Sequence, residues 1–441
     1  MENDSSNYLR TVRAQYEDYP YPHRDPAEER QRLLVTSLDS IAKISHFCFR
    51  GSRDLRQASR ILVAGGGTGD AIIYLAEQLR RSDSELVYID MSAASMTVAQ
   101  QRAEMRGLKN ISWVHGSLLD LADIQVGEFD YINSSGVLHH LADPSAGLEA
   151  LKSVLKPDGS LGLMVYAQYG RTSIYQIQEL MRLINADESD MEKQVSNTRS
   201  VLNTLPDTNW FKRNAAIWMD EIARYGDIAI FDLFLHTQDR AYTVPELYEW
   251  LGNAGLNLLA WAGSPGSAMR YDPLPHISDA GVRDRIACMP TQQQEAIAEL
   301  LDGGIRKHVV YASGQGNTTA DPTDLDNIPF FTVSMAVGEE AYQGLKGSND
   351  RPFQLRSPNS SLMVSVTPDR LTKYILRYFD GQRSLAEIFN RVRTDPDLVS
   401  GDPPEDAILL RSFQGLYDAF CPVDMMFLRN KRVPPYKSPE E

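Results

Sequence analysis

The sequence has few cysteines, no long apolar run and a deficit of positive charge. Cys48, Cys288 and Cys421 are its three cysteines in 441 residues, too far apart to indicate a zinc cluster or a disulfide framework. No uninterrupted apolar segment is long enough to cross a bilayer, and residues 1–7 lack a basic stretch that leads into an apolar one. We therefore expect a soluble cytoplasmic protein with no metal site and no membrane partner.

Acidic residues outnumber basic ones. The chain has 44 Lys and Arg against 59 Asp and Glu, which gives a formal net charge of −15 at pH 7. Such a surface repels phosphate backbones unless basic residues are clustered, so a nucleic-acid partner is disfavoured. Hydrophobic residues make up 42% of the chain and charged residues 23%, a balance typical of globular proteins, and the length suffices for two or three domains.

From residue 60 onwards, short apolar runs alternate with longer amphipathic segments. The pattern predicts strands at 61–64, 85–90, 111–115, 129–134 and 160–166, with helices at 71–79, 93–106 and 145–155. Strand and helix alternation of this kind is typical of βαβ units on a parallel sheet. It stops at 171–225, where the composition is helical, and resumes with a helix at 244–251, a strand at 256–261 and an edge strand at 308–312.

These patterns divide the chain into five segments. We expect a lead-in at 1–58, a ligand-binding core at 59–170, a helical cap insert at 171–240, the completion of the core at 241–315 and a small C-terminal domain at 328–441. In that domain, helices beginning near Thr367 and Ser384 flank a turn at Asp380-Gly381, which predicts a helix-turn-helix or winged-helix module. Residues 366–395 contain six basic and four acidic residues, and this surplus of two positive charges is too small for a protein that reads DNA. The module is therefore expected to dock a protein or form a homodimer.

A glycine-rich loop, Gly65-Gly-Gly-Thr-Gly-Asp70, joins the first predicted strand to the first helix. Glycine permits a sharp turn and the close approach of a ligand to backbone N–H groups at a helix start. A dinucleotide fingerprint counted from Gly65 needs glycine or alanine at position 70, where the negative charge of Asp70 would instead meet a diphosphate. The loop therefore disfavours a dinucleotide, and the chain has no phosphate loop ending in Gly-Lys-Ser/Thr.

The pattern Gly65-x-Gly67-x-Gly69, with Asp90 at the end of the second strand, resembles the class I S-adenosylmethionine-dependent methyltransferases. His115-Gly-Ser-Leu118 and the segments 129–140 and 155–159 resemble later motifs of that family. The resemblance implies an α/β fold: a doubly wound, mostly parallel, seven-stranded Rossmann-like sheet. It also implies S-adenosyl-L-methionine as the methyl donor and S-adenosyl-L-homocysteine as the product. The residues expected to hold the donor are Tyr21, Gly65, Gly66, Gly67, Gly69, Asp90, Met91, Ser117, Leu118, Asn133 and Ser134.

Two positions depart from the family's pattern. The family usually has an acid two residues before the first glycine, where this chain has Val63, so one indirect hold on the methionine end of the donor is missing or replaced. The turn after the third strand often carries Asp, where this chain has Ser117. We therefore expect Met91, Leu118 and backbone groups to hold the adenine, and the donor to bind more weakly than in relatives.

Four residues at the carboxyl ends of the fourth and fifth strands are candidates for catalysis: His139, His140, Tyr166 and Tyr169. The histidines could act as a base and the tyrosines could orient an acceptor, but packing of the following helix and of the core explains them as well. In the lead-in, Pro20 and Pro22 hold Tyr16, Tyr19 and Tyr21 in an extended segment. We expect these tyrosines to close over the donor.

The chain is therefore expected to be a methyltransferase whose acceptor is not a nucleic acid. The lead-in, insert and C-terminal domain are similar to bacterial methyltransferases that include protein-lysine methyltransferases, so a protein or peptide side chain and a small metabolite both stay open as acceptors. One alternative is a non-catalytic regulator that binds the donor, consistent with Val63 and Ser117. Another is an aminopropyltransferase, although the fourth-strand edge offers Asn133-Ser-Ser135 and not the carboxylates that a polyamine needs.

Overall fold

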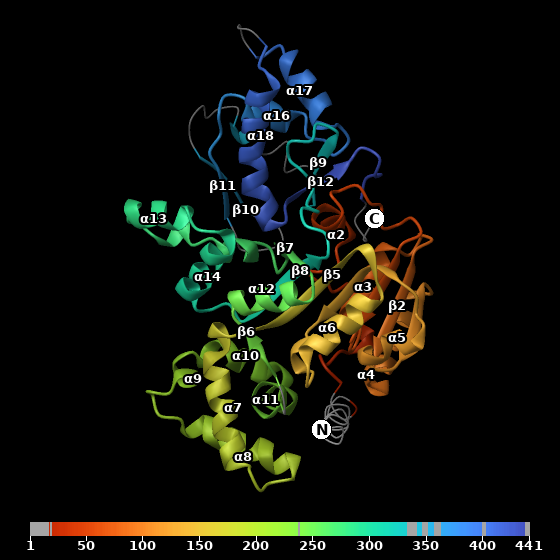
Figure 1. The fold of residues 1–441 in the computed structure, drawn as a ribbon, viewed down its shortest axis with the longest axis vertical. Helices are drawn as coiled ribbons and strands as arrows, with labels where there is room; N and C mark the ends of the chain where they lie inside the picture. The colour runs from red at the N-terminus through yellow and green to blue at the C-terminus, as the bar shows by residue number, and fades with distance from the viewer. Residues whose placement is uncertain are drawn as a thin grey trace.

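A mostly parallel sheet forms the centre of the computed structural model, which describes residues 17, 20–236, 239–332, 342–345, 352–356, 363–398 and 403–436 (Figure 1). Seven strands follow one another across the sheet, and a two-residue strand, β6 (Ala241–Tyr242), pairs with the fifth of them. In spatial order the seven are β3 (Ile111–His115), β2 (Glu85–Asp90), β1 (Arg60–Ala64), β4 (Phe129–Ser135), β5 (Leu155–Ala167), β8 (Lys307–Ser313) and β7 (Asn257–Trp261). The predicted seven-stranded fold is thus confirmed, with one short strand added.

One strand was predicted at the wrong place in the sheet. The segment 308–312 was expected at the edge, but β8 lies between β5 and β7 and is antiparallel to both. Val310, Tyr311 and Ala312 are fully buried, as a strand covered by neighbours on both sides requires. A continuous apolar run is typical of such an interior strand, and β7 takes the edge instead.

The two faces of the sheet carry separate hydrophobic clusters. Along β1, Leu62 and Ala64 pack into one cluster, and Ile61 and Val63 pack into the other, because successive side chains of a strand point to opposite faces. On the first face lie α6 (Pro144–Ser153) and α12 (Val244–Asn253), and on the second lie α2 (Ile41–Cys48), α3 (Asp70–Gln78) and α4 (Ala93–Arg106). Helices on both faces make the sheet doubly wound.

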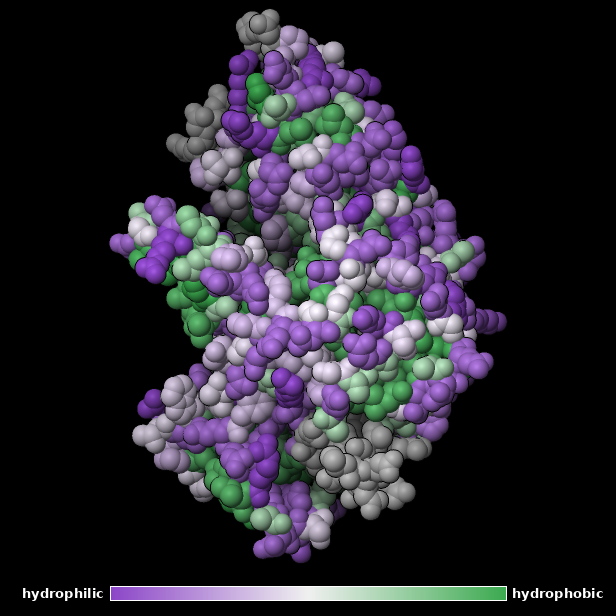
Figure 2. All heavy atoms as spheres, in the orientation of Figure 1, coloured by the Kyte–Doolittle hydropathy of each residue, from purple (hydrophilic) through white to green (hydrophobic). Residues whose placement is uncertain are grey.

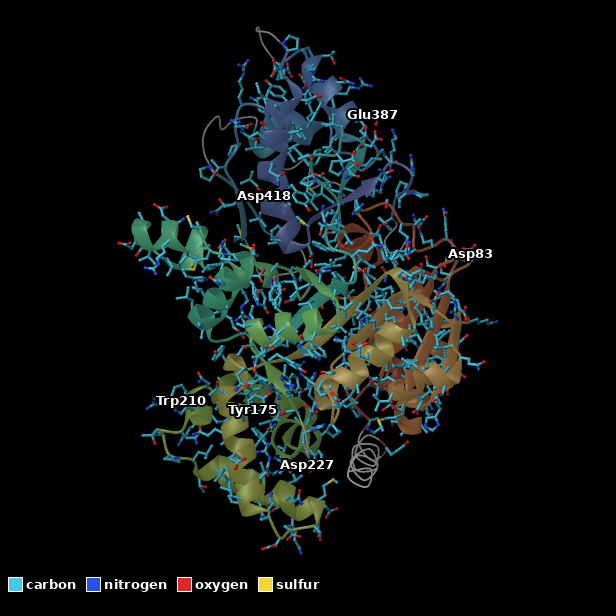
Figure 3. All side chains as sticks on the ribbon, in the orientation of Figure 1. Asp83, Tyr175, Trp210, Asp227, Glu387 and Asp418 are labelled. Atoms are coloured by element: carbon cyan, nitrogen blue, oxygen red, sulfur yellow. The ribbon has the colours of Figure 1, made fainter. Side chains whose placement is uncertain are left out.

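The predicted helical insert forms a lobe at one end of the molecule (Figure 1). Its helices are α7 (Thr172–Ile184), α8 (Met191–Thr204), α9 (Trp210–Arg213), α10 (Ala215–Tyr225) and α11 (Asp227–Ile230), followed by a short π-helical turn, η5 (Phe231–Leu235). Buried side chains of these elements, among them Ile177, Phe211 and Phe234, form the lobe's own core. Figure 3 shows Tyr175, Trp210 and Asp227 in this lobe.

The C-terminal unit lies at the opposite end (Figure 1). It pairs β9 (Asn327–Phe331) with β12 (Met426–Asn430) and β10 (Phe353–Arg356) with β11 (Met363–Val366), beside α16 (Thr372–Arg377), α17 (Leu385–Arg393) and α18 (Asp406–Phe420). The predicted capping box of Ser384 and Glu387 starts α17. The preceding helix begins at Thr372 and not near Thr367, because Asp369 accepts hydrogen bonds from the N–H groups of Leu371 and Thr372. That this unit is a winged-helix module, and that it spans residues 328–441, stay predictions.

Helix α2 connects the C-terminal unit to the sheet. The Nζ of Lys43 lies 2.7 Å from Asp424, and the Nε2 of His46 lies 2.9 Å from the hydroxyl of Tyr417.

Figure 2 shows that hydrophilic residues cover most of the face in view. No helix in the described part of the chain combines the length and the apolar character that crossing a membrane requires.

Candidate functional site

A cavity of about 770 Å³ lies at the carboxyl ends of the parallel strands. Its walls come from the glycine loop after β1, the ends of β2, β4 and β5, the turn after β3, the lead-in and the helical insert. This edge of a doubly wound sheet is where ligands bind in such folds. Among the described residues, no group of His, Cys, Asp or Glu side chains is arranged to hold a metal ion.

The glycine loop forms one wall of the cavity and leaves no room for side chains. A Cβ on Gly66 would come within 2.2 Å of the ring of Tyr88, and one on Gly67 within 2.8 Å of the carbonyl oxygen of Tyr21. Gly65 and Gly67 also have positive φ angles of 74° and 51°, which favour glycine. Gly65, Gly66 and Gly67 thus expose backbone groups to the cavity, where a ligand can approach them closely.

Asp90 ends β2 and faces the same cavity. Its two carboxylate oxygens accept hydrogen bonds from the backbone N–H groups of Gly67 and Ser92, at 2.7 and 2.8 Å. Burial raises the pKa of Asp90, and these two hydrogen bonds oppose the rise. Because each carboxylate oxygen has further acceptor capacity, Asp90 can still bind two ligand hydroxyls.

The wall beyond Asp90 is mostly apolar. Met91, Ser117 and Leu118, which the sequence analysis expects to hold the donor, all line the cavity. The Ser117 hydroxyl accepts a hydrogen bond from the N–H of Leu119 at 3.2 Å, and so caps a short helical turn. Met91 and Leu118 therefore give this part of the wall apolar side chains.

The lead-in is fixed against the glycine loop by charged and polar contacts. Arg24 donates two hydrogen bonds to Asp70, at 2.9 and 2.6 Å, and Arg102 donates a third at 2.7 Å. The Thr68 hydroxyl donates to the carbonyl of Pro22 at 2.6 Å. Although burial opposes it, the two arginines hold the pKa of Asp70 below its usual range. Asp70 is therefore charged but paired, which weakens the sequence argument that its charge repels a diphosphate.

The helical insert and the adjoining strands form the opposite half of the cavity, which we call the acceptor half. It combines aromatic rings with charges of both signs. Its residues are Tyr21, Tyr166, Arg171, Trp218, Glu221, Tyr225, Asp232, Arg306 and Lys307.

Asp232 is the most buried carboxyl group of the acceptor half. It lies on η5, and 5% of the residue is exposed. Burial raises the pKa of Asp232 to about 7, against the opposing charge of Arg171. Burial, followed by the charges of Asp232 and Glu221, also raises the pKa of Tyr21 above its usual range, so that hydroxyl stays protonated. Near neutral pH, Asp232 can thus either hold or release a proton.

Arg171 is buried in the same half with unused hydrogen-bond donors. Its guanidinium lies 3.6 Å from the ring centre of Tyr166, and its Nη2 lies 3.9 Å from a carboxylate oxygen of Asp239. Within the described parts of the chain, neither its Nε nor its Nη2 has a hydrogen-bond partner. A buried donor without a partner is costly, so this side chain suits a ligand oxygen.

The predicted catalytic residues divide into two pairs. His140 and Tyr166 line the cavity, whereas His139 and Tyr169 do not. The ring of His139 is fully buried between His140 and Tyr166, with centres 4.1 and 4.0 Å away, and burial holds its pKa well below the usual range. Tyr169 lies in the short turn after β5 and is 38% exposed. For His139, the packing interpretation fits the structure better than a catalytic one.

Two of the predicted donor residues also lie away from the cavity lining, whereas Tyr21 and Asn133 belong to it. Gly69 precedes α3, where a Cβ would come within 2.8 Å of the Cβ of Ala99 on α4, so this glycine serves helix packing. Ser134 is fully buried and points to the face of β4 opposite Asn133. Tyr16 and Tyr19 lie outside the described residues.

Sequence reasoning did not find most of the acceptor half, nor Asp39, which lines the cavity near Asn133. No motif marks these residues, because they come from segments that meet only in the folded chain. One signal was present: Trp218, Glu221 and Tyr225 are spaced by three and four residues, which places them on one face of α10. A polar and aromatic face on an insert helix can indicate a binding wall.

Comparisons with known proteins agree with this geometry. A family model described as methyltransferase domain matches residues 62–161. The chain is 35% identical over 294 residues to an uncharacterized protein of Synechococcus, covering 66% of this chain and 68% of that protein. It is 36% identical over 115 residues to the tRNA 5-carboxymethoxyuridine methyltransferase of Escherichia coli, covering 26% of this chain and 42% of that enzyme.

A further match is the ubiquinone biosynthesis O-methyltransferase of Acinetobacter baylyi, 26% identical over 137 residues, with 30% of this chain and 56% of that enzyme covered. Among solved structures, PKMT2 from Rickettsia typhi in complex with AdoHcy superposes with a TM-score of 0.60 at 15% identity. That superposition covers 89% of this chain and 76% of the other, so the shared fold extends well beyond the sheet.

Proposed function

Because the chain belongs to the class I S-adenosylmethionine-dependent methyltransferases, we propose that its acceptor is an amine on a protein or peptide side chain, of the lysine type. The bound donor supplies a methyl group that is already activated by its sulfonium charge. The protein therefore has to hold the donor, place the amine and take up a proton.

The rest of the cavity, which we call the donor half, is lined by the glycine loop, Asp90, Met91 and Leu118. It fits the nucleoside end of S-adenosylmethionine. We assign Asp90 to the two ribose hydroxyls, Met91 and Leu118 to the faces of the adenine, and the backbone of Gly65–Gly67 to the methionine portion. The close packing of Tyr88 and Tyr21 against the loop supports this assignment, because it excludes side chains at Gly66 and Gly67 and leaves their backbone groups exposed to the cavity. Tyr21 belongs to the acceptor half, yet its carbonyl lies against Gly67 of the loop, so it and Asn133 would border the reacting methyl group.

Asp232 carries the proposal for an amine. A protonated amine has no lone pair, so it must lose a proton before it can attack a methyl group. Asp232 lines the acceptor half with a pKa of about 7, so it can take up that proton near neutral pH. Once the proton has passed to the Asp232 carboxylate, the amine lone pair would form the new bond to the methyl carbon while the carbon–sulfur bond breaks, and its electron pair would stay on the sulfur of S-adenosylhomocysteine. The rings of Trp218 and Tyr225 line the same half and can contact the methylated cation.

A polypeptide acceptor is supported by the helical insert. The insert exposes the apolar side chains of Leu183, Ile184 and Trp210, the last 59% exposed, and these can contact a second chain. The likeness to PKMT2 covers 89% of the chain, so it extends beyond the donor-binding strands. The net charge of −15 favours a basic polypeptide over RNA.

A small metabolite that carries both an amine and an acidic group is the second candidate. It is favoured by Arg171, whose Nε and Nη2 have no hydrogen-bond partner in the described part of the chain and suit a carboxylate, and by the cations of Arg306 and Lys307 in the same wall. Both candidate acceptors present an amine. In one the amine belongs to a polypeptide side chain, and in the other to a small molecule with an acidic group.

Incubation with methyl-labelled donor and a cell extract fractionated by size separates the candidates. We expect acid-stable label on lysine of polypeptides from the wild type and a loss of it in Asp232→Asn, with unchanged binding of S-adenosylhomocysteine. Label confined to small molecules would overturn the polypeptide acceptor. Donor binding without any methyl transfer would identify a regulator. Formation of a polyamine from the decarboxylated donor would identify an aminopropyltransferase.

A further inference from the structure

Asp39 is a buried carboxyl group in the wall of the donor half that no predicted motif includes. It lies just before α2, and only 1% of the residue is exposed. It nevertheless borders the cavity, together with the adjoining residues 35–38 and the glycine loop. A carboxylate is expensive to bury without a partner of opposite charge, so its surroundings need an explanation.

Two neutral groups donate hydrogen bonds to this carboxylate. The hydroxyl of Thr36 donates to one oxygen at 2.6 Å, and the side-chain amide of Asn133 donates to the other at 2.7 Å. In the described part of the chain, no Lys, Arg or His forms an ion pair with Asp39. The carboxylate thus has hydrogen bonds but no counter-charge.

The position of Asp39 is fixed by the helix that follows the glycine loop. The side chain of Gln78, at the end of α3, donates to the Asp39 carbonyl at 2.8 Å and accepts from the N–H of Ile41 at 3.1 Å. These contacts hold the start of α2 against α3. The carboxyl group is therefore presented to the cavity by a fixed backbone and not by a mobile loop.

Asp39 lies at the methionine end of the expected donor site. Asn133, which it contacts, is the register partner of Val63 on β1, and Val63 lines the cavity two residues before Gly65, the first glycine of the loop. Asp90, Met91 and Leu118 take the nucleoside end. Val63 offers no charge here. Asp70, the other acid beside the glycine loop, is already paired with Arg24 and Arg102, so Asp39 is the carboxyl group available for a cation at this end of the described cavity.

We propose that Asp39 binds the α-ammonium group of the methionine portion of S-adenosylmethionine. The ammonium supplies the cation that the carboxylate lacks, and Thr36 and Asn133 orient the two oxygens toward it. Such a charge-assisted hydrogen bond in a dry site is among the strong ones. The proposal concerns the donor alone, so it holds or fails independently of the acceptor.

Two ligands that differ in this ammonium test the proposal. S-adenosylhomocysteine carries it, whereas 5′-methylthioadenosine has the same nucleoside and thioether but no amino-acid portion. Calorimetry on the full chain should show that Asp39→Asn weakens binding of S-adenosylhomocysteine by about 10- to 100-fold. Binding of methylthioadenosine should change by less than about twofold, since Asn fills the same space and keeps a polar contact.

Asp90→Asn is the matched control, because it should weaken both ligands by a similar factor. An equal loss of both ligands in Asp39→Asn would mean that Asp39 only shapes the pocket, and would overturn the proposal. Unchanged binding of both ligands would overturn it as well. If Asp39→Asn does not fold, Thr36→Val replaces it: loss of one donor to the carboxylate should weaken S-adenosylhomocysteine selectively, and an equal effect on both ligands would contradict the assignment.

Discussion

Asp90 accepts a hydrogen bond of 2.7 Å from the backbone N–H of Gly67, so the acid at the end of β2 is tied to the glycine loop after β1. A second bond to the same loop comes from the Tyr88 hydroxyl, which donates to the Gly67 carbonyl at 2.6 Å. Two alternate residues of β2, Tyr88 and Asp90, thus bind both backbone polar groups of Gly67, its C=O and its N–H. The donor site is organised by the protein's own contacts before any ligand binds.

Replacement of Asp90 should therefore have two effects. In Asp90→Ala the ribose hydroxyls lose their acceptor and the Gly67 N–H loses its partner. We expect affinity for S-adenosylhomocysteine to fall by about 30-fold or more, since hydrogen bonds to charged groups are worth about 1.5–3 kcal/mol each. Calorimetry measures the affinity, and thermal unfolding of the ligand-free protein should show only a small loss of stability. Unchanged affinity would contradict the ribose assignment.

A side chain at Gly67 should abolish donor binding. Even the Cβ of alanine would lie 2.8 Å from the Tyr21 carbonyl, and the residue has a positive φ. We expect Gly67→Ala to displace the lead-in and weaken the donor, and the larger Gly67→Arg to abolish its binding altogether. Gly107→Ala, at the end of α4, is the matched control, because Gly107 has a positive φ of 66° and its Cβ would meet nothing within 4 Å. Retained affinity in Gly67→Arg would refute the site.

Much of this donor half could be predicted from the sequence, and the acceptor half could not. Gly65–Gly67 and Asp90 belong to one βαβ unit, so their spacing in the chain determines how they meet. Asp39, Arg171 and Asp232 reach the cavity from three separate segments, and only the tertiary fold brings them together. Gly69 and His139 carried the expected pattern yet serve packing, because a local pattern does not distinguish a lining residue from one directly behind the lining.

Donor binding should depend on pH through Asp39. Burial raises the pKa of Asp39 to about 6, while Thr36 and Asn133 oppose the rise and the charge of Asp70 adds to it. Tyr74, Tyr131 and Tyr311 also face it, and the pKa of each is raised, so they stay neutral in this range. Only the ionised carboxyl binds an ammonium, so affinity should be full above pH 7 and fall by up to about tenfold per pH unit below 6.

The ratio of the affinities for S-adenosylhomocysteine and methylthioadenosine isolates this titration from that of Asp90, which affects both ligands. We expect the ratio to fall on acidification in the wild type and to stay flat in Asp39→Asn. Thr36→Val should move the midpoint to higher pH, because the ionised carboxylate loses a hydrogen bond. A flat ratio in the wild type would count against the ammonium contact.

The buried ion pairs between the lead-in and α4 should contribute to stability. Arg102 is 1% exposed and pairs with Glu29 at 2.6 Å and with Asp70 at 2.7 Å. Arg102→Met would leave Glu29 paired with Arg106 alone and Asp70 with Arg24 alone, and we expect a loss of about 2–3 kcal/mol in the free energy of unfolding. Urea denaturation measures it. The exposed pair of Arg182 and Glu179 is the control, and Arg182→Met should cost less than about 1 kcal/mol.

Catalysis should depend on Asp232 with a pH profile that binding does not share. As the base for the acceptor amine, Asp232 must be ionised, so kcat/KM should rise with pH until about 7, where its carboxyl is half ionised, and then level off. Asp232→Asn should lower kcat by about 100-fold or more and remove this rise, while the affinity for S-adenosylhomocysteine is kept. Glu221→Gln, on the same wall, is the comparison: it should keep the rise but move it to lower pH, because the charge of Glu221 helps to raise the pKa of Asp232. A profile unchanged in Asp232→Asn would assign the proton to another group, and His140 would then be the first residue to replace.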